Sequence, residues 1–315
     1  MTPLAGKVAV VAGATRGTGR GIASMLGEAG ATVYCTGRSV RGHPATGGRP
    51  ETIEETAERV SAYGGRGIPV QTDQTQPDQV AALFDRVRAD SGRLDILVND
   101  VWGGDELTEF GKTFWQVSLD KGLLMLQRAV HSHIITSRLG VPLMLDSPGP
   151  GLVVEITDGD GFHYRGNIFY DLVKTSIIRL AFAMSRELRR RPITALAITP
   201  GFLRSEAMLD HFGVTEANWR DAGKKDPNFL ASETPCFVGR AVAALAADPN
   251  VSAKAGRVFS SWDLSDEYGF GDIDGNHPHW GRHAAAAFGQ FSRCDEGFYA
   301  YCVGGPMDTI FANWP

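Results

Sequence analysis

Two side chains capable of proton transfer lie four residues apart in the segment FYDLVK, the phenol of Tyr170 and the ammonium of Lys174. Residues at i and i+4 share one face of a helix, so the two groups are neighbours if this segment is helical. An adjacent ammonium favours the phenolate and should lower the phenol pKa from its ordinary value of about 10. The pair predicts a general acid/base, although such pairs also occur on plain helix surfaces.

A second candidate site is the glycine-rich segment GATRGTG, which contains Gly13, Gly17 and Gly19 with Thr15 between them. It follows an apolar run and precedes a helical pattern. Glycines in such a turn let the backbone approach a pyrophosphate at the helix N-terminus. The spacing is GxxxGxG and differs from the usual GxGxxG, but its position still predicts a dinucleotide site.

Charge at the end of the second apolar run predicts which dinucleotide binds. Folds selective for NAD place an acidic residue there, about 20 residues after the glycines. Here Arg38 takes that place, Arg16 lies in the glycine loop, and no acid occurs between Glu28 and Glu51. Two converging guanidinium groups need an anion between them, which the 2′-phosphate of NADP(H) supplies. We predict NADP(H) as cofactor; the alternative is two solvated arginines.

The elements that must position these residues alternate between short apolar runs and segments of helical period, an order typical of a parallel sheet covered by helices. Strands are predicted at residues 7–12, 32–36, 67–72, 94–98, 151–157, 193–198 and 256–261. Helices are predicted at residues 17–29, 50–63, 77–90, 114–139, 169–190 and 233–247. The fold class is α/β, a single doubly wound (Rossmann-type) domain at residues 1–265 with a seven-stranded parallel sheet. Residues 266–315 form a C-terminal extension packed on that domain.

Two segments depart from this pattern. Residues 140–150 (GVPLMLDSPGP) are predicted to be an insert at the surface. Residues 277–283 (HPHWGRH) space His279 and His283 for one helical face, but Pro278 and Gly281 favour an irregular loop. We therefore predict no metal site.

Composition limits the classes of partner. The net charge of −5 provides no long-range attraction for nucleic acid or anionic membranes. No apolar stretch approaches the ~18 residues of a membrane span. The four cysteines lack paired spacing, which predicts reduced and mostly buried thiols. We expect a cytoplasmic protein that acts on a small molecule, without a nucleic acid or membrane partner.

The order and spacing of its motifs resemble those of the short-chain dehydrogenase/reductase family over roughly residues 5–265. The resemblance rests on GATRGTG, TDQT at Asp73, LVND at Asn99, YDLVK, and PGFLRS from Pro200. The tail DLSDEYGFGDIDG is similar to that of the dehydrogenase/reductase member one branch of the family. A homodimer or homotetramer is expected.

The resemblance implies a role for each matched residue. Tyr170 is expected to be the acid/base, and Lys174 its partner, which also binds the nicotinamide ribose. Asp73 resembles the adenine contact, and Asn99 the residue that steadies the central strands beside the cofactor. The loop that meets the nicotinamide carboxamide corresponds to Pro200, Gly201 and Ser205.

Two positions differ from the family's pattern. The serine that polarises the substrate normally lies thirteen residues before the tyrosine, where this chain has Thr157, followed by Asp158. Threonine keeps the hydroxyl donor, so the contact can survive. The asparagine that holds a water for the proton relay aligns with Ser118, or with Asp120 in a competing alignment.

Polar residues after the fifth predicted strand are candidates for substrate contact or an ordinary solvated loop; they are Asp158, Asp160, His163, Tyr164 and Arg165. His163 is also a candidate second proton carrier. Phe202 begins an apolar segment with Met208, Leu209 and Phe212, which forms a lid or packs on the core.

These observations predict an NADP(H)-dependent oxidoreductase that interconverts a carbonyl and an alcohol by hydride transfer, with Tyr170 as acid/base. One alternative is a noncatalytic NADP-binding sensor or scaffold. Another is a lyase or epimerase that retains its nucleotide. The enzyme is distinguished from the sensor by whether the hydroxyls of Thr157 and Tyr170 converge beside the nicotinamide.

Overall fold

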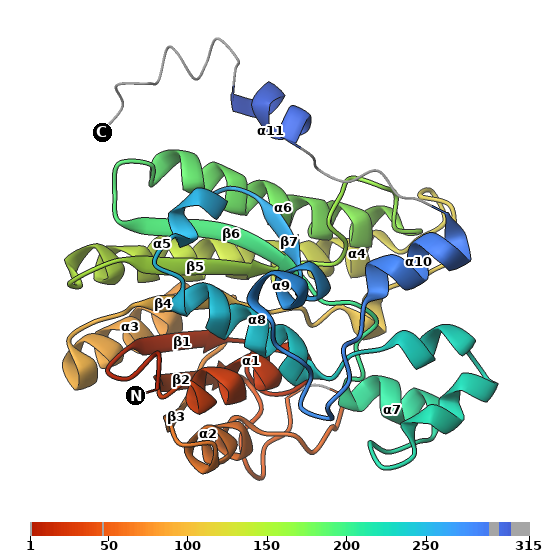
Figure 1. Cartoon of the computed structure of the whole chain (residues 1–315), viewed down its shortest axis with the longest axis horizontal. Helices are drawn as coiled ribbons and strands as arrows, with labels where there is room; N and C mark the ends of the chain where they lie inside the picture. Colours follow the sequence, from red (N-terminus) through yellow and green to blue (C-terminus); the bar gives the residue numbers. More distant parts are fainter. Residues whose placement is uncertain (1, 46, 290–295, 304–315) are drawn as a thin grey trace.

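The computed structural model describes residues 2–45, 47–289 and 296–303. Within them, seven parallel strands form one sheet with the order β3-β2-β1-β4-β5-β6-β7 (Figure 1). The strands are β1 (Val8–Ala12), β2 (Thr32–Gly37), β3 (Arg66–Gln71), β4 (Ile96–Asn99), β5 (Gly151–Ile156), β6 (Ile193–Thr199) and β7 (Val258–Ser260). The predicted doubly wound α/β fold is confirmed, and each predicted strand overlaps an observed one.

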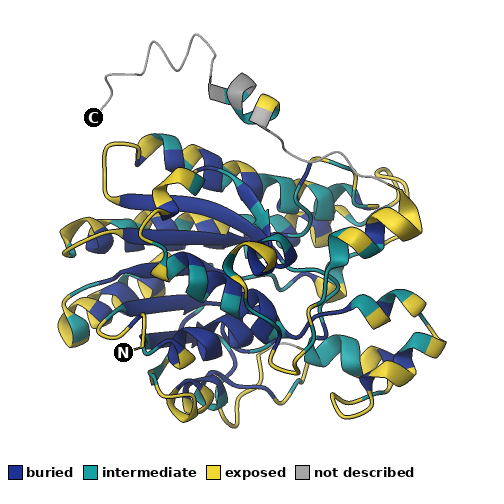
Figure 2. Ribbon diagram, in the orientation of Figure 1, coloured by how far each residue is buried: buried dark blue, intermediate teal, exposed yellow. Residues whose placement is uncertain are grey.

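Helices cover both faces of the sheet, and the central strands are buried (Figure 2). One layer contains α1 (Gly17–Glu28), α2 (Ile53–Ala62), α8 (Pro235–Ala247) and α9 (Ser261–Tyr268), and the other contains α3 (Pro77–Ser91), α5 (Ser132–Asp146) and α6 (Ile168–Glu187). In β1, Ala9 and Val11 pack in the first layer and Val8 and Val10 in the second, because successive side chains of a strand alternate. Burial on both faces explains why the strands are continuous apolar runs in the sequence.

The direction of strand addition reverses between β1 and β4. The chain proceeds from β1 outward to β3 and then places β4 on the other side of β1. The parallel register sets Ala12 beside Asn99, so the two strands end together. This reversal is where doubly wound sheets bind ligands.

The long helix after β4 begins later than predicted. Ser118 caps α4 (Leu119–Leu126), so residues 114–117 lie before the helix. A π-helical turn, η2 (Gln127–His131), joins α4 to α5.

The same helix also ends later than predicted, because α5 continues to Asp146. The prediction of a surface insert at residues 140–150 is therefore wrong for its first seven residues. Leu143 and Met144 are buried in the core, and a Cβ on Gly140 would lie 2.6 Å from the ring of Phe84. This tertiary burial outweighs the poor helix propensity of the glycine and proline in the segment.

The segment after β6 forms a small unit of its own around α7 (Glu206–Phe212), η3 (Trp219–Lys224) and η4 (Pro227–Ala231). Its core consists of Phe212, Trp219, Ala222 and Phe229, with Phe202, Met208 and Leu209 packed against it. Arg204 connects this unit to the tail: its guanidinium lies 4.0 Å from the ring of Trp219 and donates to Asp274 at 2.6 Å. The apolar residues therefore pack on one another, beside the main core.

The described part of the C-terminal extension is partly helical. The boundary predicted at residue 265 falls inside α9, and two further helices follow, α10 (Trp280–Phe288) and α11 (Glu296–Val303). The prediction of an irregular loop at residues 277–283 is wrong from Trp280 onward, because the His279 side chain accepts a hydrogen bond from the Arg282 amide and caps α10. Cys35 and Cys236 are buried free thiols, whereas Cys294 lies outside the described residues.

Candidate active site

A cavity of about 1600 Å³ opens at the carboxyl ends of β1, β4, β5 and β6. Most of the predicted site residues line it: Gly13, Thr15, Arg16, Gly17, Arg38, Asp73, Thr157, Asp158, His163, Tyr170, Lys174, Pro200, Gly201, Phe202 and Ser205. Gly19, Asn99 and Ser118 do not. The cavity thus gathers segments that lie more than a hundred residues apart in the chain.

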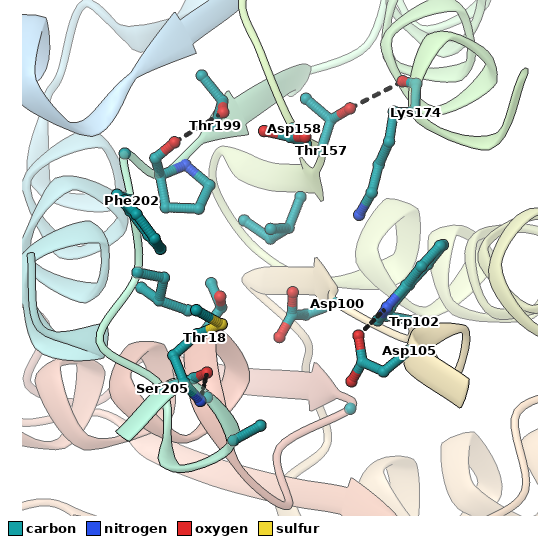
Figure 3. A pocket seen from close by; sticks show the side chains of 18 of the residues that line it. Thr18, Asp100, Trp102, Asp105, Thr157, Asp158, Lys174, Thr199, Phe202 and Ser205 are labelled. Carbon is teal, nitrogen blue, oxygen red and sulfur yellow. Dashed lines mark hydrogen bonds between the residues drawn. The ribbon is translucent and has the colours of Figure 1, made fainter. Parts of the chain in front are cut away.

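Tyr170 and Lys174 occupy the first two turns of α6. The Asn167 side chain caps this helix by accepting hydrogen bonds from the amides of Phe169 and Tyr170. The Tyr170 ring packs edge-on against Trp102 at 5.2 Å between ring centroids. Lys174 extends from α6 toward Trp102, and its ammonium lies 4.4 Å from the centre of the indole ring (Figure 3). Trp102 is fixed in turn by its Nε1, which donates to Asp105 Oδ1 at 2.6 Å.

The Tyr170 hydroxyl donates to Asp158 Oδ2 at 2.8 Å. Burial raises the pKa of Tyr170, and the charge of Asp158 and the hydrogen bond to it raise it further. The prediction that the lysine would lower the pKa of this phenol is therefore wrong for this arrangement. The main reason is burial, which penalises a phenolate, and the carboxylate beside the hydroxyl adds to it.

Lys174 is half-buried in the cavity wall, where two acids act on its charge. Burial lowers the pKa of Lys174, although the charges of Asp158 and Asp100 oppose this effect. Burial likewise raises the pKa of Asp100 to about 8, although Lys174 and the Gly19 amide act against it. Asp100 directly follows β4 and lies in the middle of the site (Figure 3).

The glycine loop between β1 and α1 is shaped by close packing. A Cβ on Gly13 would lie 2.5 Å from the Asp100 carbonyl oxygen, and one on Gly19 would overlap the Gly13 carbonyl. Gly17 has φ +53° and begins α1. Its amide donates to Glu206 Oε2 at 2.8 Å. A negatively charged oxygen therefore lies at the N-terminus of α1, where the helix dipole and the free amides favour an anion.

The two arginines predicted to bind a 2′-phosphate both line the cavity, but Arg16 already has a partner. Its Nε donates to Glu51 Oε2 at 3.0 Å, and Arg49 pairs with the same carboxylate at 2.7 Å. Burial raises the pKa of Glu51, but the hydrogen bonds from Arg49 and Arg16 outweigh it and hold the pKa below its ordinary value. The second terminal nitrogen of Arg16 is buried and has no hydrogen-bond partner among the described residues, so one donor is left for an anion.

Comparison with known proteins fits this geometry. Residues 7–212 match the family model described as short chain dehydrogenase. The chain belongs to the short-chain dehydrogenase/reductase family.

It is 37% identical over 280 residues to dehydrogenase/reductase SDR family member 1 of Mus musculus, with 87% of this chain and 86% of that protein covered. The Homo sapiens protein of the same name is 35% identical over 277 residues, with 87% and 85% covered. The fold is also that of a short chain dehydrogenase from Mycobacterium thermoresistibile, with a TM-score of 0.72 at 23% identity over 88% of this chain and 92% of that one. Oxidoreductases of this family use a nicotinamide cofactor, either NAD or NADP.

Thr157, the residue expected at the family's substrate-polarising position, lines the cavity, but its hydroxyl already has a partner. The Thr157 hydroxyl donates to the backbone carbonyl of Lys174 at 2.7 Å, and the residue is 2% exposed (Figure 3). The hydroxyls of Thr157 and Tyr170 therefore do not converge. β5 ends at Ile156, and successive side chains along an extended chain point to opposite sides. The residue that follows Thr157, Asp158, therefore faces the phenol.

The family's asparagine aligns with Ser118 or, in the competing alignment, with Asp120. Ser118 caps α4 through the Lys121 amide, and neither it nor Asp120 lines the cavity. The π-helical turn places Arg128 at the cavity, where it donates to the Gly103 carbonyl at 2.9 Å. Asn99 is buried behind the cavity wall, and its side-chain amide donates to Glu155 of β5 at 2.6 Å. This bond joins two central strands, as expected of a residue that steadies them beside the cofactor.

The loop after β5 is anchored by Arg165, which is buried and donates to the Asp158 carbonyl at 2.6 Å and to Asp171 of α6 at 3.1 Å. His163 lies on this loop and lines the cavity. Opposite, Phe202 stacks edge-on against Trp280 of α10 at 5.6 Å, so the tail contributes to the wall.

Several residues that line the cavity had no prediction: Asp100, Trp102, Asp105, Arg128, Arg49, Glu206 and Trp280. The segment DVWGGD that directly follows the fourth strand could have revealed the first three, because ligands bind at the carboxyl ends of strands. No short motif marks the others. In the described part of the chain no helix is long and apolar enough to cross a membrane, and no group of His, Cys, Asp and Glu side chains could hold a metal ion.

Proposed function

We propose that the chain is an NADP(H)-dependent oxidoreductase that interconverts a carbonyl and an alcohol, with Tyr170 as the acid/base. The observation that carries the proposal is the cavity, in which the Tyr170 and Lys174 pair, the glycine loop and the arginines face one space. NADP(H) supplies or accepts the hydride when it is bound.

The cavity residues fit this cofactor. Its pyrophosphate would take the anion position at the Gly17 amide, which a carboxylate oxygen now fills at 2.8 Å. Its 2′-phosphate would bind Arg38 and the unpartnered nitrogen of Arg16.

The rest of the cofactor would lie along the same wall. Asp73 would meet the adenine end, and Lys174 the nicotinamide ribose. The loop of Pro200, Gly201 and Ser205 would hold the nicotinamide. Tyr170 would then exchange a proton with the substrate oxygen in a site walled by aromatic rings.

The Thr157 hydroxyl donates to the Lys174 carbonyl and the Tyr170 hydroxyl donates to Asp158, so the criterion of two converging hydroxyls is not met. The proposal stands because a titratable group still adjoins the phenol. Replacement of Tyr170 decides between the enzyme and the noncatalytic sensor.

Tyr170→Phe should lower turnover of a carbonyl or alcohol found in a substrate panel by about 10²–10⁴, the usual contribution of a positioned proton donor. Binding of NADPH, measured by titration, should remain near that of the parent. Tyr268→Phe is the matched control, because Tyr268 also donates to an aspartate, Asp248 at 2.6 Å, but outside the cavity. Unchanged turnover in Tyr170→Phe would favour the sensor.

A further inference from the structure

The contact between Tyr170 and Asp158 is rigidly held from both sides. Tyr170 lies in the first turn of α6, which the Asn167 side chain caps. Asp158 is held by its carbonyl, which accepts from Arg165, and Arg165 is itself paired with Asp171 of α6. The 2.8 Å hydrogen bond therefore joins two parts that one buried arginine locks together.

The direction of this hydrogen bond decides what the phenol offers to the cavity. Its proton points to Asp158 Oδ2, so the oxygen lone pairs are left for a ligand. The oxygen of a carbonyl substrate needs a hydrogen-bond donor at this position, whereas the hydroxyl of an alcohol substrate needs a hydrogen-bond acceptor. With a carboxylate beside it, Tyr170 is thus set to receive the proton of an alcohol while it passes its own proton to Asp158.

We propose that Asp158 is the terminal proton acceptor of the site and that Tyr170 relays the proton between it and the substrate oxygen; this rests on the proposed function. In alcohol oxidation the substrate O–H bond breaks as one forms on Tyr170, and the Tyr170 O–H bond breaks as one forms on Asp158. The bound, oxidised nicotinamide would accept the hydride from the substrate carbon. In carbonyl reduction the same proton returns through Tyr170 to the substrate oxygen.

Other charged groups surround the phenol but are oriented differently. Besides Asp158, they are His163 and Arg165 after β5, Asp100 and Asp105 after β4, Arg128 on η2 and Lys174 on α6. Lys174 lies over the Trp102 ring and makes no hydrogen bond to the Tyr170 hydroxyl among the described residues. Asp105 bonds the Trp102 indole, and Asp100 bonds the Gly19 amide. Asp158 is the carboxylate that the phenol contacts directly.

The test is the pH dependence of kcat/KM for alcohol oxidation in the full chain and in Asp158→Asn. The amide keeps an oxygen that accepts the Tyr170 hydrogen bond, but it cannot take the proton. The variant must then rely on the phenolate, so its rate should fall by about 10²–10⁴ near neutral pH. The ratio of the parent's kcat/KM to that of Asp158→Asn should shrink roughly tenfold per pH unit between about pH 6 and about pH 9.

Two comparisons separate this role from a structural one. At each pH, kcat/KM for carbonyl reduction should fall by the same factor as kcat/KM for alcohol oxidation. The reason is that the substitution does not change the overall equilibrium constant of the reaction. Asp248→Asn is the matched control, since it removes the charge from the other tyrosine–aspartate pair, outside the cavity. A merely structural role for Asp158 would lower the rate without changing its slope against pH, and parallel profiles would overturn the proposal.

A second measurement does not depend on turnover. The protein is labelled at tyrosine Cζ with ¹³C and titrated without cofactor, and Tyr170→Phe assigns the signal. Burial and the Asp158 charge raise the pKa of Tyr170. The signal should therefore shift toward phenolate at a lower pH in Asp158→Asn than in the parent.

Identical titration curves for Tyr170 in the parent and in Asp158→Asn would overturn the proposal even if no substrate were known. By contrast, a parent protein that oxidises no alcohol and reduces no carbonyl with either nicotinamide nucleotide refutes the proposed function, whatever the titration shows. The two failures are therefore distinguishable.

Discussion

Glu206 occupies the anion position of the glycine loop, so its replacement by glutamine should tighten cofactor binding. Its carboxylate accepts from the Gly17 amide at 2.8 Å and lies 3.4 Å from the Arg20 guanidinium. A pyrophosphate that bonds the Gly17 amide must displace this carboxylate. The free energy that the carboxylate contributes there is subtracted from the binding free energy of the cofactor.

The size of the effect follows from these contacts. A hydrogen bond to a charged group contributes about 1.5–3 kcal/mol, and an anion at a helix N-terminus adds about 0.3–1 kcal/mol. A neutral amide oxygen keeps roughly half of the hydrogen-bond strength. Glu206→Gln should therefore remove about 1–2 kcal/mol from the cofactor-free state, which corresponds to roughly 5–30-fold tighter binding. Arg20 keeps Glu55 as a partner at 3.1 Å and stays available to attract phosphate.

The assay is calorimetric titration of the parent and variant with NADP(H). Glu55→Gln is the matched control, since Glu55 also pairs with Arg20 but contacts the capping box of α2 and not Gly17. It should leave the affinity unchanged. If Glu206→Gln binds the cofactor equally or more weakly, Glu206 does not compete with the pyrophosphate and the reasoning is refuted.

The parent should bind NADPH more tightly than NADH, because each charge-assisted bond from Arg38 or Arg16 to a 2′-phosphate contributes about 1.5–3 kcal/mol. Arg38→Asp should reverse that preference, and equal affinities of the parent for the two nucleotides would remove the argument. Glu233 is fully buried, and burial raises its pKa to about 8 although Ser261 and the Gly201 amide lower it. A carboxyl whose pKa is raised on folding keeps its proton in the folded state, so its contribution to stability is lost as the pH rises from its ordinary pKa of 4.5 through about 8. Glu233→Gln has no such proton, so its free energy of unfolding should rise relative to the parent by up to about 1.4 kcal/mol per pH unit across that range; urea unfolding curves with a constant difference would contradict this.

The sequence by itself determined where the strands lie along the chain and that they form a doubly wound sheet. The strands buried on both faces are mostly apolar runs, which can be recognised without knowledge of their partners. The pairing of Tyr170 with Lys174 follows from helical geometry alone. The glycine loop is equally local, because its place between β1 and α1 is set by adjacent residues.

Tertiary structure decided how far the helix after β4 extends. Gly140 and Pro142 are local signals against a helix, and reading them as such placed residues 140–150 at the surface. Only contact with Phe84 of α3 and burial of Leu143 in the core make the helix continue. These contacts join residues far apart in the chain, so no window of sequence contains them.

Tertiary structure also decided the electrostatics of the site, and for the same physical reason. The charge of a side chain is known from the sequence, but its partner depends on which distant segments fold together. Gly17 meets Glu206 across 189 residues, and Arg16 meets Glu51 across 35. Whether Thr157 or Asp158 faces Tyr170 depended on where β5 ends and how α6 packs on it, because one residue along a strand turns a side chain to the opposite face.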